Sequence, residues 1–496
     1  MSAHTLLRRE WTAFRRPARL VALATAALAV IALGLLYAAG NRASCDGPCP
    51  SGPVAADGTA VSDQFWFRHR DLGPQGSLTV RMTSMHGTIT YPPPDHDEIV
   101  PGLVPWAKAG IIVKDGVRRG SSYAALMMTG THGVHMQYAY RHDIAGGPGG
   151  VSAEAPRWLR LTRAGDTITG QESTDGKRWH TVGTARLDGL PDTVQVGLFA
   201  TSPGDLTLRE VGLGGAIEEV RFTQATGVFD HVDLTGAAGG AWRSDAVGGM
   251  NHTDWEKYHH ASGSTERDGV ITVSGTGDIG PSPTDGAVTV ERMLPAGLFI
   301  ALLVVLIVAA RHGARAGRDT VPRGVLAARA AVVAAAVFVT GLIAVGTVVP
   351  AGGAILHGNG IQVQPVPVLT GVRLVAGTAV VLALCAILAF ALGVLLRRGW
   401  AAILAALLLV AVPYGVTAFP LLPDALAQWL LRLTPAAGFA VQQTAVAYPQ
   451  VVMHYAPSAG YFPLPGWAGV AVLCAYALVL LRLAAGRMPG RGQDWR

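Results

Sequence analysis

Two cysteines that lie close together are the first candidates for chemistry in this sequence. Cys45 and Cys49 frame Asp46-Gly47-Pro48 directly after an apolar segment. On the oxidising side of a membrane, such a pair is expected to form a disulfide. A metal site would need two further ligands, and none is close by in the sequence. Cys385 and Cys474 fall in apolar stretches, where cysteine usually behaves as a small inert hydrophobe.

Two polar clusters have the composition of metal ligands. Asp95-His96-Asp97-Glu98 offers hard oxygens of the kind that calcium prefers, but a calcium site needs six or more placed oxygens. A solvated loop after three prolines is therefore the favoured interpretation. A second group, His252, Asp254, His259 and His260, has the composition of a zinc site, but its spacing matches no strong template. We expect no metal in this chain.

The composition indicates a large membrane part. Half of the 496 residues are hydrophobic and only 15% are charged, against about 25% in an average globular chain. A helix needs about 20 apolar residues to cross the hydrocarbon core. The apolar stretches predict six transmembrane helices, at 20–40, 294–310, 327–349, 370–396, 400–419 and 467–485.

Arginine indicates the orientation of these spans. Residues 42–292 carry 21 Lys and Arg against 29 Asp and Glu, whereas the rest of the chain carries 18 against 4. The positive-inside rule places Arg-rich flanks in the cytoplasm. We therefore expect a multi-pass plasma-membrane protein with both termini cytoplasmic, including the tail 486–496, and with residues 41–293 extracellular. No nucleic-acid partner is expected, because the basic residues flank spans and do not form one patch.

The segment before the first span has a pattern of its own. Leu7, Trp11 and Phe14 recur at helical spacing, and arginines occupy the other faces. This pattern predicts that residues 1–19 form an amphipathic helix on the cytoplasmic membrane surface. A plain basic flank is the alternative for this segment. For the first span itself, a cleaved signal peptide is the alternative, since Ala38-Ala39-Gly40 is a tolerable cleavage site.

Residues 54–240 are patterned as β-strands. Alternating stretches at 77–82, 158–162 and 194–199 are typical of half-buried strands. Asp175-Gly176 predicts a hairpin, because both residues tolerate a positive φ. Short strands without helical stretches predict an all-β sandwich or jelly roll inserted into the helical membrane protein. Residues 41–53 are a linker in this scheme, and residues 241–293 a β-rich annex or stalk.

The inserted domain resembles concanavalin A-like lectin/glucanase sandwiches. The matching pieces are Trp106–Ile111, Pro156–Leu161, Ser173–Gly176, Trp179 and Val228–Val232. Hydrolases of this fold carry a Glu-x-Asp-x-Glu strand, which supplies the two carboxylates of a glycosidase. This sequence has no such triple, so the resemblance implies glycan or cell-wall contact without hydrolysis. Candidate contact residues are Tyr123, Tyr138, Tyr140 and Arg141, with ordinary sheet positions as the alternative.

Nothing in the chain indicates its own source of energy. There is no G-x-x-x-x-G-K-[ST] phosphate loop, and the four lysines all lie within 42–292. Ion-coupled transporters usually bury a carboxylate or His in a span, and the six expected spans contain no Asp, Glu, His or Lys. The chain is therefore expected to be no enzyme but the passive partner of an energy-supplying subunit.

Both ends of the chain resemble six-span ABC-2-type permeases of actinobacterial ABC exporters. The matching motifs are Leu6–Trp11, Leu433–Thr444, Tyr448–Val451, Gly460–Leu464 and Trp467–Gly469. In this family two permease halves, as a homodimer or with a second permease subunit, bind cytosolic ATPase subunits that carry ATP and Mg. The chain itself would need no cofactor.

The resemblance also assigns roles to individual residues. It implies that the surface helix and the first cytoplasmic loop contact the ATPase, which assigns coupling to Leu7, Trp11, Phe14, Arg315, Arg318 and Arg323. It implies a re-entrant hairpin at about 421–446, with Pro435, Gly438, Gln442 and Gln443 in its broken, partly polar helix. The loop at 311–326 is shorter than the basic stretch that the family carries there.

The expected function is that of an exporter permease whose substrate the sequence does not name. An alternative is a membrane-anchored module that binds glycan or cell wall and uses its spans mainly as scaffold.

Overall fold

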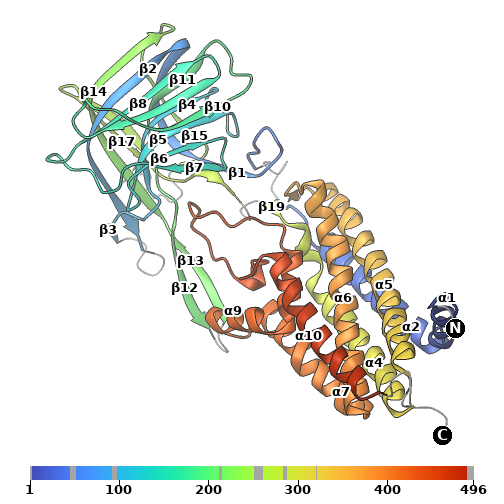
Figure 1. Cartoon of the computed structure of the whole chain (residues 1–496). Helices are drawn as coiled ribbons and strands as arrows, with labels where there is room; N and C mark the ends of the chain where they lie inside the picture. The colour runs from blue at the N-terminus through green and yellow to red at the C-terminus, as the bar shows by residue number, and fades with distance from the viewer. Residues whose placement is uncertain are drawn as a thin grey trace.

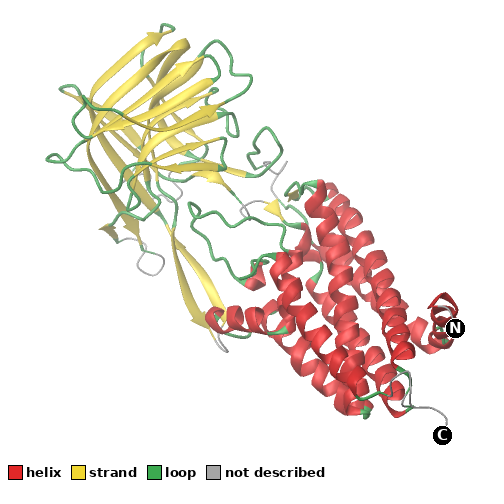
Figure 2. Cartoon of the chain, viewed as in Figure 1, coloured by secondary structure: helices red, strands yellow, loops and turns green. Residues whose placement is uncertain are grey.

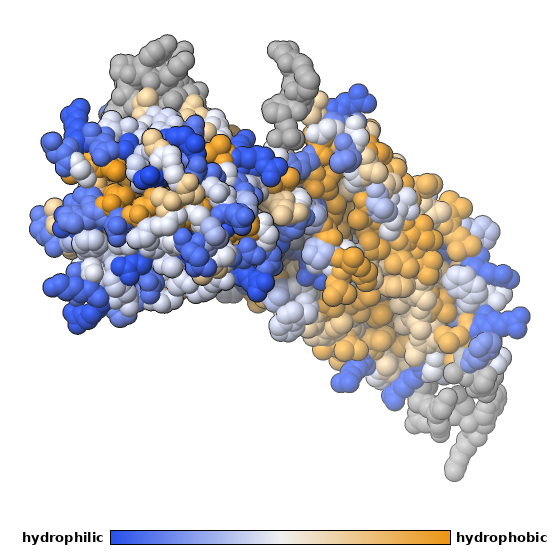
Figure 3. Space-filling model, turned by 90° about the horizontal axis from the view of Figure 1, so that it is seen from above, coloured by the Kyte–Doolittle hydropathy of each residue, from blue (hydrophilic) through white to orange (hydrophobic). Residues whose placement is uncertain are grey.

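The structure, a computed structural model, describes residues 3–44, 52–91, 98–211, 215–250, 261–282, 287–319 and 321–488. It has two parts, a β domain and a helical bundle (Figure 1). The amino-terminal helix lies at the end of the bundle that is remote from the β domain. Coloured by hydropathy, the bundle presents mainly apolar side chains and the β domain mainly polar ones (Figure 3). This contrast is what a membrane part joined to a water-exposed domain requires.

Six helices of the described residues are long and apolar enough to cross a membrane, which confirms the predicted number of spans. They are α2 (Pro17–Gly40), α4 (Pro295–Arg318), α5 (Arg323–Gly358), α6 (Val368–Leu396), the segment Gly399–Ala418 and α10 (Gly466–Gly486). The fifth of these is interrupted: α7 (Gly399–Ala406) passes through a π-helical turn, η2 (Leu407–Ala411), into α8 (Val412–Ala418). The chain is thus a multi-pass membrane protein with an inserted β domain.

Shorter helices complete the bundle. They are α1 (Ala3–Phe14), α9 (Asp424–Leu433) and the 3₁₀ helices η1 (Val290–Met293), η3 (Pro435–Gln442) and η4 (Pro457–Ala459).

The second span differs from its predicted bounds. Helix α4 continues through the arginines to Arg318, and α5 begins at Arg323. The expected loop at 311–326 is therefore mostly helix, with a connection of only residues 319–322. Ala and Arg are good helix formers, so the helix outlasts its apolar stretch. One consequence is that His312 lies within a membrane helix, contrary to the expectation that no span contains His.

Small residues allow the central helices α4 and α6 to approach closely. A Cβ atom at Gly313 would overlap the carbonyl oxygen of Phe390. Gly317 and Gly393 are restricted in the same way by the backbones of the facing helices. This use of glycine is typical of membrane helix interfaces, where packing contributes much of the association energy.

The β domain is an antiparallel, sandwich-like structure (Figure 2), as predicted. Its main sheet has 14 strands, nine of them in the order β10-β9-β8-β2-β11-β4-β5-β6-β7. Their bounds are β2 (Phe65–Thr90), β4 (Lys108–Lys114), β5 (Tyr123–Thr129), β6 (Val134–Tyr138), β7 (His142–Ala145), β8 (Arg157–Ala164), β9 (Thr167–Ser173), β10 (His180–Arg186) and β11 (Val194–Thr201). Strand β2 is 26 residues long and pairs with five other strands. The strand lengths are therefore less uniform than the regular spacing of short strands in the sequence predicted.

The predicted hairpin at Asp175-Gly176 is present between β9 and β10. Gly176 adopts φ +70°. The Asp175 carboxylate accepts hydrogen bonds from the backbone N–H groups of Arg178 (2.8 Å) and Lys177 (2.9 Å). These bonds lower the pKa of Asp175 and fix the turn.

The described part of 241–293 is not a separate annex. Strand β15 (Arg243–Val247) pairs with β2, and β17 (Val270–Gly275) pairs with β14 (Thr223–Ala237) and with β16 (Gly263–Arg267). These strands extend the main sheet. Strand β3 (Ile99–Pro101) also joins it at β2.

Candidate functional site

The end of the bundle remote from the β domain gathers the arginine-rich segments around helix α1. Glu10 on α1 is buried and accepts a hydrogen bond from Nε of Arg329 on α5, at 2.9 Å. Arg329 also lies 3.6 Å from the carboxylate of Asp319. Removing one partner of an ion pair that is this well shielded would lower folding stability, because the other charge would stay buried without compensation. Helix α1 is therefore fixed to the bundle and does not hang from α2 as a free arm.

The three apolar residues of α1 have different surroundings. Phe14 is completely buried, with its ring edge-on to His312 at 5.5 Å between centroids. Leu7 and Trp11 are 41% and 42% exposed. The assignment of Phe14 to partner contact is therefore wrong, because its ring fills the core of its own chain. Leu7 and Trp11 are accessible to a partner.

The three candidate arginines also differ. Arg318 donates to the carbonyl of Arg397 at 2.9 Å, and Arg323 donates to the carbonyl of Ala485 at 3.0 Å. Both satisfy backbone carbonyls at the ends of neighbouring helices, as basic side chains commonly do. The side chain of Arg315 is exposed and makes no hydrogen bond or ion pair within the described part of the chain. It is the candidate arginine with its charge fully available.

At the other end of the bundle, two short strands tie the β domain to the membrane part. Strands β1 (Val61–Asp63) and β18 (Ile279–Pro281) pair with each other across one face of the main sheet. Both carry or adjoin a carboxylate that pairs with a buried lysine of β4. Asp63 lies 2.7 Å from Nζ of Lys114, and Asp278 accepts a hydrogen bond from Lys108. We call β1 and β18 the strap.

The strap covers one face of the central strands of the sheet. Every position of β4 and β5 is buried, so both faces of these central strands are covered. Val61 and Ile279 of the strap belong to the same apolar cluster as Phe65 and Ile112. On this face of the sheet, the backbone of β1 and β18 lies where an open groove would otherwise be.

The four candidate glycan contacts do not form one surface. Tyr123 is completely buried, and Tyr140 is 2% exposed. The Tyr140 hydroxyl donates to Asp63 at 2.7 Å; burial, reinforced by that carboxylate, raises the pKa of Tyr140. Tyr138 is half-buried and stacks on His142, whereas Arg141 is exposed and pairs with Asp57 at 2.9 Å. The assignment of Tyr123 and Tyr140 to glycan stacking is therefore wrong, because the rings of Tyr123 on β5 and of Tyr140 in the turn between β6 and β7 are both buried inside the β domain.

Gln364, in the connection between α5 and α6, joins the strap to the bundle. Its Oε1 accepts a hydrogen bond from the backbone N–H of Ala60 at 3.2 Å, and its Nε2 donates to the carbonyl of Ser282 at 2.7 Å. The strands β19 (Ala287–Val288) and β20 (Gln362–Val363) pair in parallel beside it. One amide side chain thus links the entry and the exit of the β domain to the same membrane loop.

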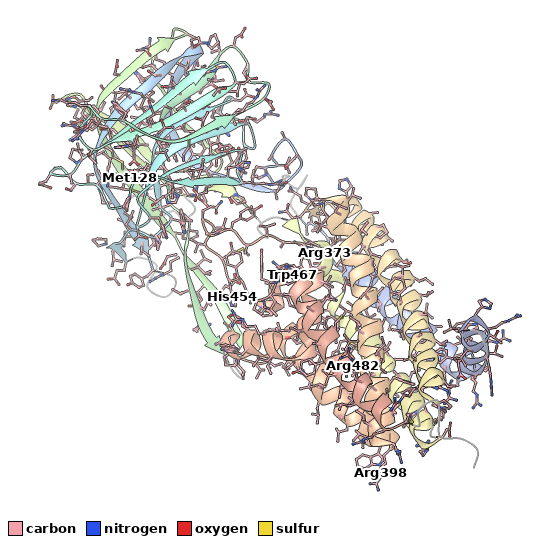
Figure 4. The ribbon with its side chains drawn as sticks, in the orientation of Figure 1. Met128, Arg373, Arg398, His454, Trp467 and Arg482 are labelled. Atoms are coloured by element: carbon pink, nitrogen blue, oxygen red, sulfur yellow. The ribbon has the colours of Figure 1, made fainter. Side chains whose placement is uncertain are left out.

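A β-hairpin makes the second connection between the two parts. Strands β12 (Asp205–Val211) and β13 (Gly215–Arg221) extend from the main sheet toward α9 (Figure 1). His454 lies at the foot of this hairpin (Figure 4). Its Nδ1 is 3.4 Å from the carboxylate of Glu218 on β13, and its Nε2 bonds the carboxylate of Asp424 at the start of α9. His454 therefore stands between one acid from each part of the molecule.

The predicted re-entrant segment is a short helix, a turn and a 3₁₀ helix. Thr434 separates α9 from η3, and Pro435 begins η3, where its missing N–H is harmless. All eight residues of η3 are buried. Gly438 packs on Leu473 of α10, and a Cβ at Gly469 would overlap the carbonyl oxygen of Ala437. Segment η3 is therefore wedged between α6 and α10 and shielded by them, as irregular backbone in a membrane requires.

The polar end of η3 borders a carboxylate that the sequence patterns did not single out. Glu291 of η1 is 5% exposed and accepts hydrogen bonds from the backbone N–H and the hydroxyl of Thr444. Gln443 binds the same loop: its Oε1 accepts from the N–H of Phe462 and its Nε2 donates to Ala445, each at 2.9 Å. The only local signal for Glu291 is an acidic residue placed just before an apolar span.

Some predicted sites lie outside the described residues. They are Cys45 and Cys49, Asp95 to Asp97 of the acidic loop, and the group His252, Asp254, His259 and His260. The disulfide stays a prediction. Within the part of the chain that is described, no group of three or more His, Cys, Asp or Glu could hold a metal ion.

No family model matches the chain, and no curated protein matches it. Among solved structures, scytalido-glutamic peptidase with a transition-state analogue inhibitor aligns at 9% identity with a TM-score of 0.28, covering 44% of this chain and 99% of that one. SCP-B, a member of the eqolisin family of peptidases in complex with the tripeptide Ala-Ile-His, aligns at 7% and 0.26, with the same coverage. A functionally unknown protein from Saccharomyces cerevisiae aligns at 17% and 0.21, covering 34% and 74%. At these scores the likeness carries no argument, and the site is interpreted from its own geometry.

Proposed function

We propose that this chain is the permease subunit of an ABC exporter, which moves a substrate across the plasma membrane with energy from a separate cytosolic ATPase. The observation that carries the proposal is the exposure of Leu7 and Trp11 on helix α1, which is fixed to the Arg-rich end of the bundle. Arg315 of α4, at the same end, adds an exposed side chain with no partner among the described residues. Exposed apolar side chains and a free cation at one end of the bundle suit a protein partner. The six spans and the family resemblance of both ends of the chain support the same conclusion.

The proposal includes an orientation and partners. The Arg-rich end, with both termini, faces the cytoplasm, in keeping with the positive-inside rule. The β domain is then extracellular. The partners are an ABC ATPase subunit, which carries ATP and Mg, and a second permease, either another copy of this chain or a related subunit. The chain itself binds no cofactor in this scheme.

The rigid connections at the other end suit an exporter in which the β domain moves with the bundle. The strap, Gln364 and the Glu218–His454–Asp424 contact join the two parts at separate points. A domain that served only as a tethered glycan-binding module would need no such bracing. The glycan-binding alternative is also weakened by the burial of Tyr123 and Tyr140.

Co-purification with an ATPase subunit tests the proposal. The full chain would be co-expressed with an ABC ATPase subunit from the same organism and purified through a tag on the chain. We expect a stable complex that hydrolyses ATP. An ATPase variant that lacks the phosphate-loop lysine should still co-purify but should not hydrolyse ATP. If no ABC ATPase associates with the chain, the proposal fails.

A further inference from the structure

A groove lies at the Arg-rich end of the bundle, between the last turns of α6 and α10. Its volume is about 530 Å³, within the range of about 300–1,000 Å³ that is usual for ligand pockets in proteins. Its apolar wall consists of Leu392, Leu395 and Leu396 of α6 and of Leu483 and Gly486 of α10. We call it the α6–α10 groove.

The spacing of these residues explains how two helices form one groove. Leu392, Leu395 and Leu396 stand at i, i+3 and i+4, so they share one face of α6, and Leu483 and Gly486 share a face of α10. A Cβ atom at Gly486 would meet no atom within 4 Å beyond its own turn of helix, so the missing side chain leaves open space. Leu396 and Leu483 are 43% and 56% exposed. The groove therefore opens on the apolar outside of the bundle, where the bilayer lies.

Two arginines complete the wall, and no carboxylate is among the lining residues. The side chain of Arg482 is exposed and makes no hydrogen bond or ion pair within the described part of the chain. Arg487 donates one N–H to the carbonyl of Leu395 at 2.8 Å. Since a guanidinium carries several N–H donors, the others stay available to a ligand. The groove therefore offers two cations to an anion.

The ends of α6 and α10 do not cancel these charges. The carbonyls at the C-terminal end of a helix carry about half a unit of negative charge. Here arginine side chains already bind two of these carbonyls, since Arg487 donates to Leu395 and Arg323 donates to Ala485 at 3.0 Å. The full charges of Arg323, Arg482 and Arg487 outweigh the partial charges of the two helix ends. The potential in the groove therefore favours an anion.

The occupant must combine an anionic head with an apolar body. A soluble anion would leave the leucine wall unused, and a zwitterionic lipid would bring a cation of its own to the arginines. Guanidinium groups suit phosphate, because their N–H groups match two phosphate oxygens at once. Basic pockets between membrane helices commonly bind the heads of anionic lipids. In Figure 3, hydrophilic side chains border the apolar surface at this end of the bundle, as such a lipid requires.

We propose that the α6–α10 groove binds one anionic phospholipid from the leaflet at the Arg-rich end. Its phosphodiester lies between Arg482 and Arg487, and an acyl chain lies along Leu392, Leu396 and Leu483. The lipid covers an apolar groove that the chain itself leaves open. This inference goes beyond the proposed function and does not rest on it.

Photo-crosslinking of the full chain tests the site. The chain would be reconstituted in phosphatidylcholine nanodiscs that contain a trace of phosphatidylglycerol with a diazirine on an acyl carbon near the glycerol. Unlabelled phosphatidylglycerol would then replace part of the phosphatidylcholine. We expect crosslinks at 392–396 and 483–486, and we expect them to decline as unlabelled phosphatidylglycerol increases. The measured quantity is the mole fraction of phosphatidylglycerol that halves the labelling.

Variants distinguish the groove from a generally basic surface. Arg482→Gln removes one charge and no contact within the described chain, and it should raise the halving fraction about fivefold, whereas Arg482→Lys should retain most of the affinity. Gly486→Leu fills the groove and keeps both arginines, and it should abolish the competition. Arg398 is also exposed, at the tip of the bundle, but it does not line the groove (Figure 4). Arg398→Gln should therefore leave the halving fraction nearly unchanged.

Thermal melting of each variant would show that it is folded. Wild-type competition in both Arg482→Gln and Gly486→Leu would overturn the inference. Labelling that does not change as phosphatidylglycerol replaces phosphatidylcholine would overturn it as well, and so would displacement of the lipid by soluble glycerol phosphate. No ATPase enters the test, so the lipid site and the proposed function can fail separately.

Discussion

Truncation of Trp11 and of Phe14 should separate partner binding from folding at the Arg-rich end of the bundle. Phe14 is fully buried against His312, so Phe14→Ala should cost about 3–5 kcal/mol of folding stability, the usual cost of truncating a buried aromatic ring. Trp11 is 42% exposed, so Trp11→Ala should leave stability nearly unchanged. If Trp11 anchors the ATPase, its loss should weaken association by about 2 kcal/mol, or roughly thirtyfold.

The assay measures both quantities on the same protein. The chain in nanodiscs would be immobilised and titrated with the ATPase subunit by biolayer interferometry, and each variant would be melted by scanning fluorimetry. Arg8→Ala is the matched control on the same helix, since an exposed charge affects association rate more than affinity. Wild-type affinity in Trp11→Ala would refute the reasoning, and so would wild-type melting in Phe14→Ala.

Three further predictions concern the β domain and the orientation. Gln364→Leu removes both bonds between the strap and the membrane loop and should lower stability by about 2 kcal/mol, with faster hydrogen exchange in the strap; unchanged exchange would contradict its linking role. Bidentate hydrogen bonds from Arg81 hold the pKa of the Asp230 carboxyl below its ordinary value. The pair therefore stabilises the folded domain at any pH above the unfolded pKa of about 3.9. This contribution is lost as the pH falls through the lower pKa of the folded state. Asp230→Asn should therefore unfold more easily than wild type at pH 7, and the difference should shrink below about pH 4; a constant difference would exclude this origin. In a background without native cysteines, Ala153→Cys should react with an impermeant maleimide on intact cells and Arg315→Cys should not; the reverse pattern would invert the orientation.

The spans and the hairpin turn were predictable because their signals are local. An apolar stretch of sufficient length determines a membrane helix almost by itself, since the backbone must satisfy its own hydrogen bonds in lipid. The turn at Asp175-Gly176 is likewise held by local contacts, because the Ser173 hydroxyl and the Asp175 carboxylate accept hydrogen bonds from backbone N–H groups within the same turn. Even so, hydropathy places the end of this span at residue 310, whereas α4 continues to Arg318, because hydropathy marks where the apolar stretch ends and not where the helix ends.

The contacts between distant segments were not predictable in the same way. Periodicity places Leu7, Trp11 and Phe14 on one stripe of a helix, but it does not say which part of the stripe turns toward His312. The partners of His454 are 30 residues away at Asp424 and more than two hundred away at Glu218. The pairing of Lys108 and Lys114 on β4 with Asp278 and Asp63 at the strap depends on the closure of the whole β domain. Only the assembled fold reveals that Tyr123 and Tyr140 lie inside it.

ATP hydrolysis in proteoliposomes tests the central claim most directly. The wild-type chain and Trp11→Ala would each be reconstituted, and the ABC ATPase subunit would be added from the side of the Arg-rich end. The permease account predicts that the ATPase binds wild-type vesicles and hydrolyses ATP there, with much weaker binding to Trp11→Ala vesicles and none to empty ones. Equal binding of the ATPase to empty vesicles and to vesicles that contain the wild-type chain would contradict the permease account. Transport by the chain with no ATPase present would also contradict it.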